Sequence, residues 1–176
     1  MDIDPETAAA LGFPKLKYAW VERERRWLCA RVPEERVVRA EEISDLYVEG
    51  TRLRLREALP HDGGPAMRRL GRKADVDATT RLLTSIYLQP EEFALLADLP
   101  GLRLSKTRHH LRAPPGVALS IDRFHGALEG LILAEAEFDD VERLKAFPMP
   151  DFALCEVTDD PRYGGACLAR QGLPKD

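Results

Sequence analysis

Two pairs of glutamates are spaced so that each pair lies on one face of a strand. Glu22 and Glu24 are two residues apart, and Glu135 and Glu137 repeat that spacing far along the chain. Alternate side chains of a strand point the same way and lie roughly 7 Å apart, so like charges there repel unless a cation lies between them. Carboxylate oxygens are the ligands that hard divalent cations prefer. Two facing strands with these pairs could therefore hold one or two such cations, as phosphate-processing sites do.

Basic residues follow the same alternate spacing. Arg52, Arg54 and Arg56 alternate with leucines, and Lys106 and Arg108 form a second set. Arginine binds phosphate oxygens through paired N–H donors, and lysine binds them as a point charge. Each pattern alone is also typical of a solvated strand face. Because four such strands occur in one small chain, the combination favours a phosphate site in which acid, metal, phosphate and base neutralise one another.

The elements that must position these residues are mostly strands. Period-two stretches between turn signals predict strands, and stretches that begin with acids or proline predict helices. We expect strands over 18–32, 37–48, 52–59, 67–75, 81–88, 102–112, 117–125 and 131–138, and helices over 89–99, 141–147 and about 161–170. The result is an α+β, mostly antiparallel β chain, and sheets of about eight strands close into barrels or fold over as sandwiches.

Composition limits what these motifs can mean. The 176 residues, 44% of them hydrophobic, predict one domain over 18–176 after an N-terminal extension over 1–17. Charges of both signs are interspersed and the net charge is only −4, which does not indicate nucleic acid or a membrane as partner. With an acidic N-terminus and no apolar run long enough for a bilayer, the protein is expected to be cytoplasmic. Three widely spaced cysteines predict reduced thiols.

Several blocks together carry a resemblance to a known family. Glu22-Arg23-Glu24-Arg25-Arg26 is similar to a Glu-x-Glu-x-Lys signature, and further blocks follow over 43–56, 104–108, 119–138 and 156–169. In this order the chain resembles, over about residues 18 to 170, the CYTH domains, or triphosphate tunnel metalloenzymes. These include inorganic triphosphatases, thiamine triphosphatases and class IV adenylate cyclases. The resemblance implies a closed tunnel of eight antiparallel strands lined with charge.

The resemblance also implies a substrate, a metal and a set of site residues. The substrate would be a small-molecule triphosphate, foremost inorganic tripolyphosphate, with nucleoside or thiamine triphosphate as further possibilities, and a homodimer is possible. Mg²⁺ or Mn²⁺ would be held by Glu22, Glu24, Glu135 and Glu137. The catalytic set would be Glu22, Glu24, Arg26 and Glu137, and the substrate-binding set Arg54, Arg56, Lys73, Lys106, Arg108 and Asp122.

Two departures from the family pattern keep alternatives open. Position 26 is arginine where the signature has lysine, so charge is kept but proton exchange is lost. The strand over 81–88 contains no acidic residue, although many members have further glutamates there. Besides hydrolysis, the sequence leaves open a class IV adenylate cyclase, which converts ATP to cyclic AMP and pyrophosphate, and a non-catalytic polyphosphate- or nucleotide-binding module.

Overall fold

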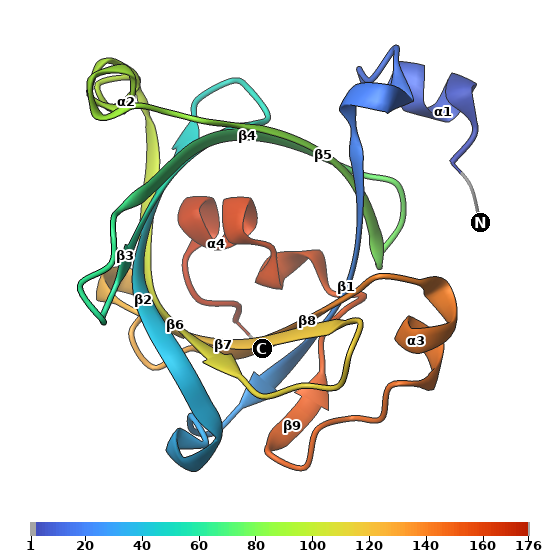
Figure 1. Ribbon diagram of the computed structural model, residues 1–176, viewed down its shortest axis with the longest axis vertical. Coiled ribbons are helices and arrows are strands. Elements are labelled where there is room, and N and C mark those ends of the chain that lie inside the picture. Colours follow the sequence, from blue (N-terminus) through green and yellow to red (C-terminus); the bar gives the residue numbers. More distant parts are fainter. Residues whose placement is uncertain (1–2, 176) are drawn as a thin grey trace.

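The structure, a computed structural model, describes residues 3–175, and eight antiparallel strands close into a barrel (Figure 1). The strands are β1 (Trp20–Cys29), β2 (Val37–Val48), β3 (Leu53–Pro60), β4 (Met67–Asp75), β5 (Thr80–Tyr87), β6 (Gly101–Leu111), β7 (Val117–Phe124) and β8 (Ile132–Phe138). Their order is β5-β4-β3-β2-β6-β7-β8-β1, and pairing of β5 with β1 closes the ring. The predicted eight-stranded barrel is confirmed, and the sandwich is excluded.

Four helices and a ninth strand surround the barrel in residues 3–175. They are α1 (Pro5–Ala10), α2 (Pro90–Ala97), α3 (Val141–Ala146), α4 (Gly165–Gln171) and β9 (Ala153–Glu156), which pairs with the end of β1. The three predicted helices are present as α2, α3 and α4. Asp140 caps α3 by accepting a hydrogen bond from the Arg143 backbone N–H at 2.7 Å, as its position before a helix predicts. Helix α1 and β9 were not predicted.

The outer face of the barrel wall is apolar and packs against the helices. Leu46 and Leu55 lie under Phe93 of α2, and Trp27 and Phe138 lie under Phe147, the residue that follows α3. On the wall formed by β4 and β5, Ala74 and Leu82 are covered by Ala8 and Phe13 from the N-terminal segment. Because side chains alternate along a strand, this packing leaves the other set of side chains for the interior.

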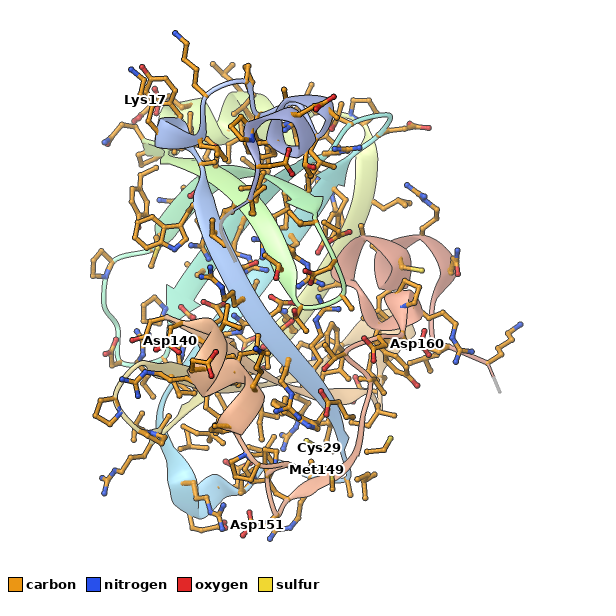
Figure 2. The ribbon with its side chains drawn as sticks, turned by 90° about the vertical axis from the view of Figure 1, so that its right-hand side faces the viewer. Lys17, Cys29, Asp140, Met149, Asp151 and Asp160 are labelled. Carbon is orange, nitrogen blue, oxygen red and sulfur yellow. The ribbon has the colours of Figure 1, made fainter. Side chains whose placement is uncertain are left out.

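Helix α4 packs across one end of the barrel. Leu168 of α4 is only 1% exposed and contacts Leu104, Phe124 and Leu133, which are the inward-facing residues at that end of β6, β7 and β8. In Figure 1 α4 lies within the outline of the ring, and Figure 2, turned by 90°, shows it on one side of the barrel near Asp160. The charged part of the interior therefore lies between α4 and the opposite mouth.

The residue Arg52 does not continue the alternation of Arg54 and Arg56, contrary to the prediction. Strand β3 begins at Leu53, after a turn in which Gly50 has a φ of +67°. Before the strand, the Arg52 guanidinium donates to the Leu11 carbonyl at 3.1 Å. The backbone has not yet entered the pleat at this residue, so its side chain binds the N-terminal segment.

Two further observations concern compartment and redox state. No helix within residues 3–175 is long and apolar enough to cross a bilayer. Cys29, Cys155 and Cys167 are free thiols, as predicted, and burial raises the pKa of Cys29 to about 11. The division at residue 17 and the cytoplasmic location stay predictions.

The packing of α4 predicts a large loss of stability on truncation of its buried leucine. Leu168→Ala removes a fully buried side chain and should lower the free energy of unfolding by about 2–4 kcal/mol. Leu173→Ala, at a position 43% exposed just beyond α4, should change it by less than about 0.5 kcal/mol. Urea denaturation of both variants checks this; equal losses would contradict the packing of α4 on the barrel.

Candidate active site

The strand register places charged residues of neighbouring strands side by side on the inner face. Arg26 is opposite Glu135 and Glu24 is opposite Glu137 across β1 and β8. On the other side of the barrel Arg56 lies between Asp45 and Arg69. The inner set includes Glu22, Glu24, Arg26, Asp45, Arg54, Arg56, Arg69, Lys73, Arg81, Lys106, Arg108, Asp122, Glu135 and Glu137.

The glutamates of β1 are held by cations from three strands. Glu24, 3% exposed, accepts from Arg26 Nε at 2.8 Å and lies 2.8 Å from Arg81 Nη1. Glu22 is paired with Lys73 of β4. Burial and the nearby Glu135 act to raise the pKa of Glu24, but the surrounding cations outweigh them and hold it below its usual value. Glu24 is therefore a carboxylate at neutral pH.

Arg26 bridges the acids of β1 and β8. Its Nε lies 3.5 Å from a carboxylate oxygen of Glu135 as well as bonding Glu24. Burial alone would lower the pKa of Arg26, yet these two carboxylates raise it above the usual value for arginine. Arg26 consequently remains a fixed positive charge and cannot exchange a proton.

Asp122 organises the cations of β6. Its carboxylate, 1% exposed, accepts from Arg108 Nε and Nη2 at 2.7 Å each and also pairs with Lys106. Arg108 continues to Glu135, so the four side chains form one chain of ion pairs. Burial acts to raise the pKa of Asp122 and Glu135, but Arg108 and Lys106 hold both low. The pKa of Lys106 is lowered, chiefly by its burial.

A second group of buried ion pairs joins β2 to β3. We call its central pair, in which the Arg56 guanidinium donates two hydrogen bonds to the Asp45 carboxylate, the Asp45–Arg56 fork. Arg56 Nε and Nη2 donate to the two carboxylate oxygens of Asp45 at 2.7 Å each, and the residues are 4% and 2% exposed. Arg54 Nε is 3.8 Å from the same carboxylate. Burial would raise the pKa of Asp45, but Arg56 and Arg54 depress it strongly. The fork fixes Arg56 against the inner wall.

Two inner charges lack an opposite partner among residues 3–175. Arg69 has no ion pair there, and its pKa is lowered by burial and by repulsion from Arg56 and Arg54. Glu137 also has none, and its pKa is raised by burial and by repulsion from Glu22. One wall thus has excess positive charge and the opposite wall excess negative charge. A polyanion together with divalent cations would neutralise both.

The glutamates suit a hard cation in their chemistry and placement. Glu24 and Glu137 are cross-strand neighbours, and the repulsion between Glu137 and Glu22 is relieved by a cation between them. Their oxygens are the ligand type that Mg²⁺ and Mn²⁺ prefer. Within residues 3–175, no three acidic, histidine or cysteine side chains converge on a common point as they lie, because Glu22, Glu24 and Glu135 turn toward basic partners. The four predicted metal ligands stay a prediction.

Comparison with known proteins identifies solved structures that share this barrel. The sequence matches no described protein family and no curated protein. The structure resembles that of the inorganic triphosphatase NE1496, with 26% identity and a TM-score of 0.58 over 88% of this chain and 97% of that one. A second NE1496 structure, described as a hypothetical protein, gives 27% identity and a TM-score of 0.57 over 84% and 97%. PH1819 of Pyrococcus horikoshii OT3 shares the fold at 21% identity and a TM-score of 0.56, over 70% and 82%.

The barrel resembles those of the CYTH superfamily of triphosphate tunnel proteins. In this barrel the strand register brings every predicted site residue to the inner face. Asp45, Arg69 and Arg81 share that face and were not predicted. Arg69 lies four residues before Lys73 in one strand, and Asp45 lies in the block over 43–56, so both could have been found by extending the alternation. Arg81 is the second residue of β5, the strand in which many CYTH members have glutamates and this chain has none, and it supplies a cation to Glu24.

The Asp45–Arg56 fork predicts a pH-dependent stability. Because the pKa of Asp45 is depressed in the folded state, the pair stabilises the fold above the unfolded pKa of about 4, and this contribution is lost as the pH falls further. Arg56→Gln leaves a buried carboxylate with only Arg54 at 3.8 Å and should cost about 3 kcal/mol at pH 7. The loss should shrink toward pH 4, because Asp45 in the variant has a raised pKa and becomes neutral.

Urea denaturation at pH 7 and pH 4 measures this difference. Arg143→Gln is the matched control, since Arg143 is paired with Asp139 and Asp140 at an exposed site and should contribute less than about 1 kcal/mol. A loss for Arg56→Gln that is the same at both pH values would show that the fork does not act through the charge of Asp45.

Proposed function

We propose that this CYTH protein hydrolyses a terminal phosphoanhydride bond of inorganic tripolyphosphate with Mg²⁺ or Mn²⁺. The single observation that carries the proposal is the separation of charge across the barrel interior, with unpaired Arg69 on one wall and unpaired Glu137 on the other. A substrate that is phosphate along its whole length fits an interior with charged groups on six or more strands. The likeness to the inorganic triphosphatase NE1496 over most of both chains supports it.

The basic wall would bind the phosphate oxygens. Among residues 3–175 Arg69 has no ion pair, and the carboxylate nearest to Arg54 is that of Asp45 at 3.8 Å, so the N–H donors of both arginines can bind a polyanion. Arg56, Lys106 and Arg108 would add charge from fixed positions. We assign Asp122 to holding Lys106 and Arg108 in place, because a carboxylate in direct contact with phosphate would repel it.

The acidic wall would hold the divalent cations. Glu22, Glu24, Glu135 and Glu137 supply oxygens from two neighbouring strands. When bound, Mg²⁺ or Mn²⁺ supplies Lewis-acid polarisation of the phosphate oxygens. Arg26 cannot act as a general base, and its contribution is to orient Glu24 and Glu135 and to offset their charge.

A phosphate-release assay tests the activity. The wild-type protein should release phosphate from tripolyphosphate with Mg²⁺ or Mn²⁺, and chelation of these ions should stop turnover reversibly. Glu24→Gln should lower kcat by at least about 100-fold, the scale of losing an electrostatic group at a reacting centre. Glu57→Gln, on the outer face of β3, is the control and should keep full activity. Tight tripolyphosphate binding in calorimetry without any turnover would establish a binding module instead.

The free cation Arg69 predicts a matched pair of variants. Arg69→Gln should raise the KM for tripolyphosphate by about tenfold or more, as expected for a lost charge-assisted hydrogen bond. Arg68→Gln, one residue earlier and paired with Glu57 on the outer face, should leave KM within about twofold. Similar KM values for the two variants would remove Arg69 from the substrate site.

A second candidate substrate is suggested by an exposed aromatic residue. Trp20 is 75% exposed and lies two residues before Glu22 on the same face of β1. A flat ring at this place could stack on the organic group of ATP or thiamine triphosphate. If so, Trp20→Ala should raise KM for ATP several-fold and leave that for tripolyphosphate unchanged. Formation of cyclic AMP and pyrophosphate, in place of phosphate, would identify a cyclase.

A further inference from the structure

Tyr47 connects the inner wall of the barrel to Arg54. It is the cross-strand neighbour of Arg54 between β2 and β3, so the two side chains lie side by side on the inner face. Burial raises the pKa of the Tyr47 hydroxyl, and the positive charge of Arg54 acts against this rise. Arg54 has little else to hold it, since Asp45 is 3.8 Å away and is already engaged by both guanidinium nitrogens of Arg56. The Tyr47 side chain is thus the cross-strand neighbour in position to restrain an arginine that faces the proposed substrate.

The hydroxyl group of Tyr47 also lies against the start of α4, at Gly165. A side chain at Gly165 would overlap the Tyr47 hydroxyl, so the helix backbone can approach this closely only with glycine. The Tyr47 ring also packs on the cluster that contains Leu168 and Leu104. The segment before α4 is joined to the site as well, because the Arg26 backbone N–H donates to the Thr158 hydroxyl at 3.0 Å.

We propose that Tyr47 is a positioning residue that links the docking of α4 to the orientation of Arg54. The inference rests on the proposed function, because it makes Arg54 a phosphate ligand. An arginine already ordered by a neighbouring hydroxyl loses less side-chain entropy on binding than a mobile one. Because coupling between two sites is reciprocal, occupancy beside Arg54 also strengthens the docking of α4.

Steady-state kinetics and calorimetry with tripolyphosphate test the link. Tyr47→Phe keeps the ring in its cluster and removes only the hydroxyl beside Arg54, so KM and Kd should rise by about tenfold with kcat nearly unchanged. Tyr163→Phe is the matched control, since Tyr163 packs on the same cluster, and it should leave KM and Kd unchanged. A role in packing alone would lower the melting temperature of both variants without a change in KM.

A double-mutant cycle separates the link from independent effects. In an Arg54→Gln background Tyr47→Phe should produce no further rise in Kd; a further tenfold rise there would overturn the proposal. Gly165→Ala should weaken binding through Tyr47, although alanine favours a helix. The loss of binding caused by Gly165→Ala should be smaller in a Tyr47→Phe background, because the hydroxyl oxygen that the alanine side chain would displace is missing there.

Hydrogen exchange provides a readout that needs no turnover. Arg54→Gln and Tyr47→Phe should each increase amide exchange in α4 at least several-fold, and Arg68→Gln should not. Unchanged exchange in the first two variants would overturn the link even if the enzyme is active. A wild-type protein that neither binds nor cleaves a triphosphate would refute the proposed function, and the exchange data would then still decide whether α4 and Arg54 are coupled.

Discussion

A charged side chain withdrawn from water must face a charge of opposite sign, and all eight strands of this barrel turn such side chains inward. Burial alone would neutralise Asp45, Asp122 or Glu24, but each has an arginine or lysine within ion-pair distance. The pairs hold the side chains in fixed positions along the wall. The fold therefore depends on a balance of charge as much as on the apolar packing outside, and the candidate site combines these paired side chains with the charges of Arg69 and Glu137, which have no ion pair among residues 3–175.

Much of this arrangement could be predicted from alternation along the strands. Glu22 with Glu24, Arg54 with Arg56 and Glu135 with Glu137 all lie on the inner face, because a strand repeats every two residues. Arg52 was wrongly included because the start of β3 depends on the turn at Gly50, which alternation does not locate. Arg69 was overlooked although it repeats the inward spacing of Lys73 in β4, and Arg81 was overlooked because it is the single cation of β5.

Other features could not be predicted from local pattern. The ion pairs that turn Glu22 toward Lys73 and Glu24 toward Arg81 depend on the closure of β5 onto β1, which is a property of the whole ring. The seven residues of α4 were expected as a helix, but their position across the end of the barrel follows from Leu168 meeting residues of three strands. Such contacts join parts of the chain that are far apart in sequence.

The position of α4 affects the order of events in a reaction inside the barrel. One end of the barrel is covered by Leu168 and its neighbours, so in the proposed reaction a polyphosphate would enter and its fragments would leave through the same opening. A phosphate product that remains bound to the basic wall would occupy the place of the next substrate molecule. It should therefore inhibit competitively and not by binding at a distant site. Turnover in a barrel with a single opening would be limited by how readily the arginines release the product anion. Strong binding brings the substrate anion into the barrel, but it also slows the release of the product.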